Sequence, residues 1–183
     1  MSAHFSPDFT YQDFGPQFQA NFFNASEWVD IVASSGAKYF VFTTKHHDGF
    51  ANWPNARSFG WNSHDIGTKN VLKILLRFLH KSGPKRDIVG ELEKSFKSDG
   101  RVKFGLYHSM FEWFHPLYLQ DAASNFTVDD FVKTKMTPEL TDLIMKYKVK
   151  CLLLTLREQG GGRFTPNLTP HSPLSDNSIK SYN

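Results

Sequence analysis

Hydrophobic positions along the chain follow two periods in turn, and the alternation predicts helices and strands one after another. Three segments carry apolar residues three and four apart, which is typical of a helix packed on one face. Each is followed closely by a short apolar run, which is typical of a strand. The predicted order is a helix over 24–35, a strand over 39–42, a helix over 87–98, a strand over 102–107, a helix over 137–147 and a strand over 151–154.

Local signals mark the ends of the three predicted helices. Asn24 or Ser26 can cap the first helix, and Gly36 stands where a left-handed stop belongs. The second helix ends at Gly100. The pair 137–138, a threonine before a proline, predicts that the third helix starts there with the threonine as its cap.

The alternation of helices and strands favours a parallel sheet with right-handed crossovers. The connections that enter the strands are short, whereas those that leave them, 45–86 and 110–136, are long and rich in Trp, His and Phe. This asymmetry is typical of a (β/α) barrel, although an open doubly wound sheet shares it. We predict an α/β fold, an incomplete TIM-barrel-like domain of about three βα units.

Two segments depart from this scheme. A helical insert is predicted at about 69–83, within a barrel domain spanning 1–156, and a low-complexity, disordered tail over 157–183. The insert has one basic face and one apolar face, so it could lie on a membrane surface or in a partner's groove, or be an ordinary solvated helix. Its basic residues recur every fourth position: Lys69, Lys73, Arg77 and Lys81.

Composition narrows the function classes. The 183 residues carry a formal net charge of only +3 with both signs mixed, which argues against a nucleic-acid partner. No apolar run is long enough to span a bilayer, and 1–21 lacks the features of a secretory signal, so the chain as written is expected in the cytosol. The single cysteine, Cys151, cannot form an internal disulfide.

Candidate chemistry gathers where the first predicted strand ends. In the segment 38–50, KYFVFTTKHHDGF, an apolar run that we expect to be buried on both faces changes abruptly to Lys45, His46, His47 and Asp48. The carboxyl ends of parallel strands are where ligands bind in α/β folds. The sequence has no HExxH motif and no cysteine pair, so we predict neither a metal site nor a cofactor.

Aromatic rings beside hydrogen-bonding side chains are typical equipment for binding sugars. Core packing is the alternative for each ring, and surface placement is the alternative for each histidine. The candidates for stacking are Trp53, Trp61, Tyr107 and Trp113, and the candidates for bonding hydroxyls are His46, His47 and His108.

Four segments resemble the α-L-fucosidases of glycoside hydrolase family 29, the animal lysosomal and secreted members above all. They are YQDFGPQFQANFFNASEW, YFVFTTKHHDGFANWP, PKRDIVGELEKSF and VKFGLYHSMFEWFHPLYLQD. The resemblance implies a (β/α)8-like barrel followed by a β-sandwich, and retaining hydrolysis of terminal α-L-fucose from glycoproteins and glycolipids. It also implies a fucosylated glycan as partner, a lysosomal or secreted location, and a homo-oligomer. The substrate ligands it implies are His46, His47 and Tyr107. Trp53, His108 and Trp113 stay as further candidates from the aromatic and hydrogen-bonding pattern alone.

The resemblance fails where the family has its nucleophile. Retention requires two carboxyl groups about 5–5.5 Å apart. The family's nucleophilic aspartate should follow the helix that ends near Lys148, but 149–162 reads VKCLLLTLREQGGG and contains no aspartate. The family's first barrel strand, acid/base segment and β-sandwich are not matched either. We therefore assign no catalytic residue and expect this chain to be inactive, a fucose-binding remnant or a fragment that binds a partner or membrane surface through 69–81.

Overall fold

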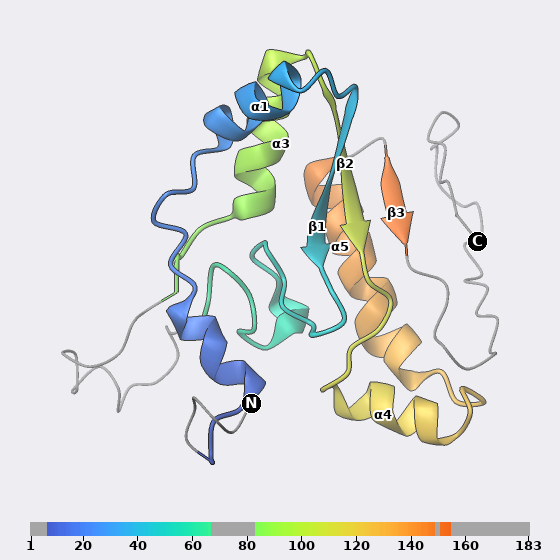
Figure 1. Cartoon of the computed structure of the whole chain (residues 1–183). Helices are drawn as coiled ribbons and strands as arrows, with labels where there is room; N and C mark the ends of the chain where they lie inside the picture. The colour runs from blue at the N-terminus through green and yellow to red at the C-terminus, as the bar shows by residue number, and fades with distance from the viewer. Residues whose placement is uncertain (1–6, 67–82, 149–150, 155–183) are drawn as a thin grey trace.

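A parallel three-stranded sheet forms the centre of the protein. The structure is a computed structural model, and it describes residues 7–66, 83–148 and 151–154. The strands lie in the order β1, β2, β3, and both pairs are parallel, so the predicted α/β fold is confirmed (Figure 1). Their bounds are Tyr39–Lys45 for β1, Lys103–His108 for β2 and Leu152–Leu154 for β3.

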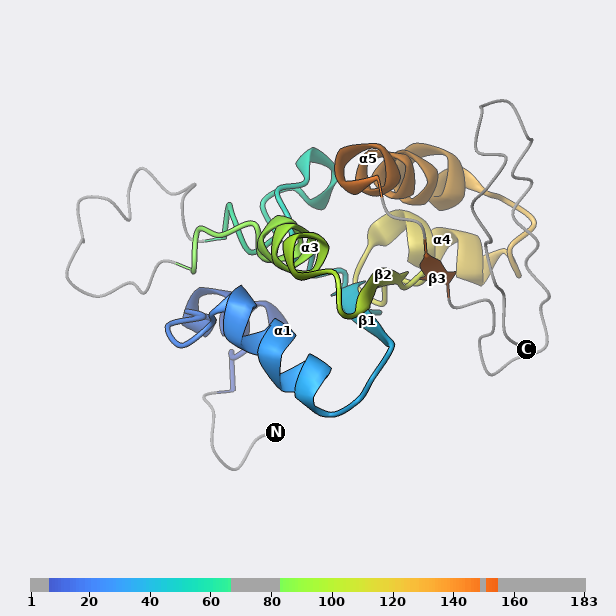
Figure 2. The same ribbon diagram turned by 90° about the horizontal axis from the view of Figure 1, so that it is seen from above.

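Each strand is preceded by a helix, as the hydrophobic pattern predicts. Seen from above, α3 and α5 cover one face of the sheet and α1 lies beside α3 (Figure 2). A further helix, α4, lies in the long connection after β2, where the hydrophobic pattern predicts no helix. The helices span Ala25–Ser34 (α1), Ile88–Asp99 (α3), Pro116–Ala123 (α4) and Thr137–Tyr147 (α5), with short turns at Tyr11–Gln17 (η1), Ala56–Ser58 (η2) and Val132–Met136 (η3).

Helices α1 and α3 each begin at a residue whose side chain caps the helix. The Asn24 side chain accepts a hydrogen bond from the backbone N–H of Ser26 at 3.1 Å, which selects Asn24 from the two predicted caps of α1. The Asp87 carboxylate accepts one from the backbone N–H of Gly90 at 2.9 Å at the start of α3. Gly36 and Gly100 have φ values of 81° and 76°, so both helices end in the left-handed conformation that glycine permits.

The predicted start of the third helix at Thr137 is confirmed, but the predicted role of Thr137 as its cap is wrong. Thr137 does not cap α5, because its backbone is itself helical, with φ −64° and ψ −46°. The π-helical turn η3 runs directly into α5, so the chain is already helical when it reaches Thr137. Pro138 remains compatible with this arrangement, since the first turn of a helix needs no amide hydrogen from it.

Among the residues that the structure describes, the core lies on the helix side of the sheet. Phe40, Phe42 and Leu106 face α1, α3 and α5, whereas Tyr39 and Val41 on the opposite face are 61% and 39% exposed. The expectation that strand β1 is buried on both faces is therefore wrong. The physical reason is that no element within the described ranges covers the opposite face, which we call the open face.

Two predictions concern segments outside the described residues. The basic helix predicted at about 69–83 lies outside the described residues, except for Gly83. The tail predicted over 157–183 also lies outside them. The domain boundary at 156 falls in the same undescribed part. Across the stretches that the structure does describe, no helix combines the length and apolar character needed to cross a bilayer.

Candidate functional site

A bulge near the end of β1 sets the direction of the side chains that follow. Thr43 pairs with Tyr107, but the next pair is Lys45 with His108, so Thr44 is the extra residue. The Thr44 hydroxyl donates to the carbonyl of Tyr107 at 2.7 Å. Strict alternation would place Lys45 on the open face beside Thr43. The bulge turns it to the helix side instead, where its side chain is fully buried.

Beyond the bulge, His46, His47 and Tyr107 come together at the carboxyl ends of β1 and β2. The His46 ring stacks on the His47 ring with centroids 4.0 Å apart, and on the Tyr107 ring with centroids 6.0 Å apart. His46 is exposed, and the other two are half-buried. The three residues predicted as sugar ligands therefore form one group, which we call the histidine–tyrosine cluster.

The loop after β2 closes one side of this cluster. Ring centroids of Phe111 and Trp113 lie 5.3 and 5.2 Å from that of His47, both near edge-on. The backbone N–H of Trp113 donates to the carbonyl of His47 at 2.8 Å. Ser109 Oγ lies 2.5 Å from His47 Nδ1. Trp113, one of the further candidates, is half exposed beside the histidines, where a ligand could reach it.

Asp48 follows the two histidines, and local partners hold it. Its carboxylate accepts from the Tyr11 hydroxyl at 3.1 Å and from the backbone N–H of Phe50 at 3.3 Å. The Trp61 indole N–H donates to its carbonyl at 3.0 Å. Burial and the neighbouring Asp48 charge together raise the pKa of the Tyr11 hydroxyl, which keeps it a donor. These bonds fix the loop that leaves β1.

Two further candidates lie away from the cluster. Trp53 is fully buried in the core, and its indole N–H donates to Asp142 Oδ2 at 3.3 Å. His108 is also fully buried, with its ring centroid 6.1 Å from that of Trp53. Both side chains lie on the helix side of the sheet. The structure therefore does not bring them to the histidine–tyrosine cluster.

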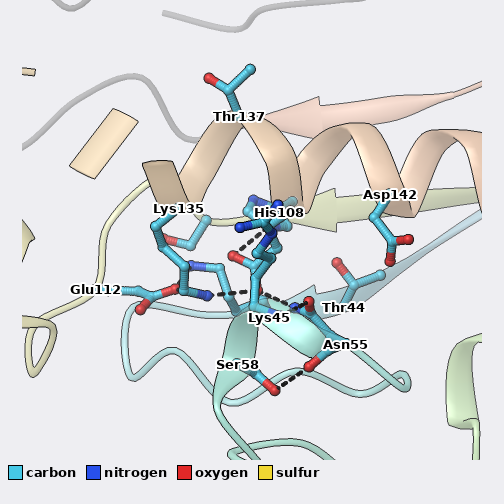
Figure 3. A network of polar contacts seen from close by, with 12 residues as sticks. Thr44, Lys45, Asn55, Ser58, His108, Glu112, Lys135, Thr137 and Asp142 are labelled. Atoms are coloured by element: carbon cyan, nitrogen blue, oxygen red, sulfur yellow. Dashed lines mark hydrogen bonds and ion pairs between the residues drawn. The ribbon is translucent and has the colours of Figure 1, made fainter. Parts of the chain in front are cut away.

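His108 belongs to a buried network of charged side chains that sequence reasoning missed (Figure 3). Lys45 Nζ lies 3.1 Å from Glu112 Oε1, and Lys135 Nζ lies 3.0 Å from the same oxygen. Lys135 Nζ also lies 2.9 Å from Glu139 Oε1, and His108 Nε2 lies 3.6 Å from Glu139 Oε2. Each residue is at most 5% exposed, so the pairs are shielded from water. We call these five residues the buried ionic network.

Charge balance explains how the buried ionic network is tolerated. Burial lowers the pKa of His108 and favours its neutral form. Burial also lowers the pKa of Lys45, although Glu112 and Glu139 oppose this. For Glu139, burial alone would raise the pKa, but the contact with His108 and the charges of Lys45 and Lys135 outweigh it and bring the pKa to about 2. Two ammonium groups thus face two carboxylates.

A cavity of about 480 Å³ opens beside Asp48, between the loops that follow β1 and β2. Aromatic rings form much of its wall, and charged side chains of the buried ionic network reach its base. The lining includes Phe59, Trp61, Phe114, His115, Glu112 and Lys135. Among the residues with described positions, no group of three or more His, Cys, Asp or Glu side chains could hold a metal ion.

Parallel strands whose carboxyl ends carry polar and aromatic side chains are typical of enzymes built on α/β barrels. Comparison of the sequence with known protein families identifies the family within that class. The model of the α-L-fucosidase family matches residues 1–157, and the chain belongs to this family.

The relatives fix how much of the family's architecture this chain covers. It is 46% identical to bovine tissue α-L-fucosidase over 148 residues, and 45% identical to human plasma α-L-fucosidase over 152 residues. These matches cover 81% and 83% of this chain but only 28% and 29% of the relatives, so the chain spans less than a third of their length. The crystal structure of Thermotoga maritima α-fucosidase in complex with fucose aligns with a TM-score of 0.63 and 28% identity, covering 83% of this chain and 33% of that one. The predicted partial match to the fucosidase barrel is confirmed.

Proposed function

We propose that the histidine–tyrosine cluster binds the terminal α-L-fucose of a glycan. The observation that carries this proposal is the arrangement of His46, His47 and Tyr107 in one group at the carboxyl ends of two parallel strands. Two imidazoles and a phenol supply donors and acceptors for sugar hydroxyls, and Trp113 offers a ring face to the apolar side of a deoxy sugar. Membership in the α-L-fucosidase family supports fucose as the sugar.

The cavity beside Asp48 suits the part of the glycan to which fucose is attached. Asp48, which lines the cavity, directly follows His47 of the cluster. Phe59, another residue of the lining, is 80% exposed. Aromatic walls with a few charged groups are typical of sites for sugar rings. A fucosylated disaccharide would then bind more tightly than free fucose.

Hydrolysis by this chain is not part of the proposal. A retaining glycosidase needs a carboxylate nucleophile and a second carboxyl group about 5–5.5 Å from it. Within the described ranges, Asp48 is held by Tyr11, and Glu112 and Glu139 are paired with lysines in the buried ionic network. The chain would therefore bind the fucose of a glycan without hydrolysing its glycosidic bond.

Two measurements on the full 183-residue chain test these statements. Titration with L-fucose, followed by calorimetry or by ligand-observed NMR, should give a saturable signal that a stereoisomer such as L-rhamnose does not match. The absence of saturable binding would overturn the sugar site. A chromogenic α-L-fucoside should give no turnover above the buffer blank, and turnover that purifies with the chain would overturn the inactive state.

The location and assembly follow from the relatives as proposals. Because the relatives include tissue and plasma enzymes, we propose a lysosomal or secreted location for the natural protein. Cell fractionation with an antibody against the chain would check this, and signal confined to the cytosol would contradict it. A homo-oligomer, also proposed from the family, predicts a mass in light scattering above that of one chain.

A further inference from the structure

Ser109 occupies an unusual place for a small polar residue. It follows the last residue of β2 directly and is completely buried, yet its hydroxyl contacts the ring of His47 across 62 positions of sequence. Its backbone N–H donates to the carbonyl of Lys45 at 3.0 Å, which ties the ends of β1 and β2 together. The backbone on both sides of the contact is therefore held in place.

Among the described residues, the Ser109 hydroxyl has three polar neighbours, but it has only one proton to give. The backbone N–H of Phe111 lies 3.1 Å from Ser109 Oγ and can only donate to it. The proton of Oγ then goes either to the carbonyl of Phe111, at 3.4 Å, or to Nδ1 of His47, at 2.5 Å. The first distance is at the outer limit of a hydrogen bond, whereas the second is shorter than usual for one, so a proton on Nδ1 would leave the hydroxyl with only the distant carbonyl of Phe111 to donate to. The Ser109 proton therefore points to Nδ1.

This direction determines the tautomer of His47. A neutral imidazole carries one N–H, so a ring whose Nδ1 accepts a hydrogen bond has its proton on Nε2. We propose that Ser109 is a positioning residue that holds His47 in the Nε2–H form and fixes the plane of its ring. Packing against His46, Phe111 and Trp113 restricts the ring further.

The consequence for binding rests on the proposed function. If His47 binds fucose, its Nε2–H donates to a sugar oxygen and does not accept from a sugar hydroxyl. Ser109 touches no sugar atom in this scheme, and it acts only through His47. The Nε2–H of His47 would then require a sugar oxygen that accepts a hydrogen bond, and this requirement would help the site recognise the sugar.

The tautomer can be measured without any sugar. The full chain is labelled with ¹⁵N in its histidines, and long-range proton–nitrogen NMR spectra identify each ring, with His47→Gln assigning its signals. We expect a pyridine-type shift for Nδ1 of His47 and a pyrrole-type shift for Nε2. The opposite assignment would overturn the proposal whatever the chain binds.

Three variants separate positioning from general packing. Ser109→Ala should abolish the fixed tautomer and weaken fucose binding about 3- to 10-fold, the size expected for one hydrogen bond. Ser109→Thr, which keeps the hydroxyl, should restore the nitrogen shifts. Ser63→Ala is the matched control, because Ser63 is also fully buried and donates to the carbonyl of Arg86 at 2.7 Å, in a different loop.

The outcomes are distinguishable. If the wild-type chain shows the predicted nitrogen shifts but binds no fucose, the proposed function fails and the role of Ser109 on His47 stands. If Ser109→Ala leaves both the shifts and the affinity of the wild type unchanged, the positioning role is overturned while the sugar site stands. If Ser63→Ala shifts the His47 signals as Ser109→Ala does, the effect is general and the proposal is overturned as well.

Discussion

The rings of His46 and His47 lie one above the other, with centroids 4.0 Å apart and planes 26° from parallel. Neighbouring residues in a regular strand face opposite ways, so these two rings can meet only because β1 ends at Lys45 and the chain turns there. The structure thus unites two side chains that would lie on different faces of a longer strand.

The first prediction concerns this stacked pair. His46→Ala should weaken fucose binding by about 1–2 kcal/mol, because an imidazole that bonds a sugar hydroxyl is lost, while the exposed position makes the effect on folding small. Calorimetric titration gives the affinity, and urea denaturation gives the stability. The matched control is His64→Ala, which removes another exposed imidazole, in the loop that precedes α3. Equal losses of affinity in the two variants would refute a specific role for His46.

A second prediction addresses the buried ionic network. Glu139→Gln should lower the free energy of unfolding by about 3–5 kcal/mol, because the buried ammonium groups of Lys45 and Lys135 would then share the single carboxylate of Glu112. Urea denaturation monitored by tryptophan fluorescence measures the loss. Glu93→Gln provides the comparison, since Glu93 pairs with the exposed Lys97 at 3.7 Å and should cost less than about 0.5 kcal/mol. Similar costs for both substitutions would mean that the network is open to water in solution.

The pKa values in this network predict how stability changes in acid. The pKa of Glu139 falls from 4.5 to about 2 on folding, so its contribution is complete above about pH 4.5 and is lost as the pH falls towards 2. Burial also lowers the pKa of His108 below 6.5, so the unfolded chain takes up that proton first and stability begins to fall below about pH 6.5. Urea midpoints measured from pH 7 to 3 should therefore decline steadily.

Substitution separates the two contributions. His108→Asn should flatten the upper part of this pH profile, and Glu139→Gln should flatten the part below about pH 4.5. A wild-type profile that stays level between pH 7 and 4, or a decline that both variants retain in full, would show that these groups do not carry the acid sensitivity.

The open face leads to a fourth prediction. Val41→Ala should cost less than about 0.5 kcal/mol of stability, because its side chain already contacts solvent, whereas Val89→Ala in the core should cost about 1–3 kcal/mol. Thermal and urea unfolding of the two variants give the comparison. If Val41→Ala were as costly as Val89→Ala, something would cover the open face in solution.

Much of this architecture could be predicted from local sequence signals. Caps such as Asn24, stops such as Gly100 and the short apolar runs between them are properties of neighbouring residues, and the structure confirms them. The hydrophobic pattern does not predict helix α4, because its eight residues span little more than two turns, too few to show a helical period clearly. The prediction that Thr137 caps α5 is wrong because a π-helical turn precedes it, and such a turn has no clear sequence signature.

The site was predictable only in part, for a physical reason. A strand end rich in histidine can be recognised in the sequence, so His46, His47 and Tyr107 can be chosen as candidates without a structure. The buried ionic network is not, because Lys45 and Glu139 lie far apart in the chain and charged residues are ordinarily exposed. His108 resembled a ligand because it follows Tyr107, but alternation along β2 places its side chain on the opposite face.

The bulge at Thr44 also has a consequence for changes in chain length. Deleting Thr44 would remove the extra residue and leave Lys45 directly after Thr43, so the Lys45 ammonium group would stay on the helix side. Deleting Val41 instead would let the strand pair evenly only by turning Phe42 out to the open face and Thr43 into the core. Homologues should therefore tolerate loss of the residue at the bulge better than a deletion earlier in the same strand.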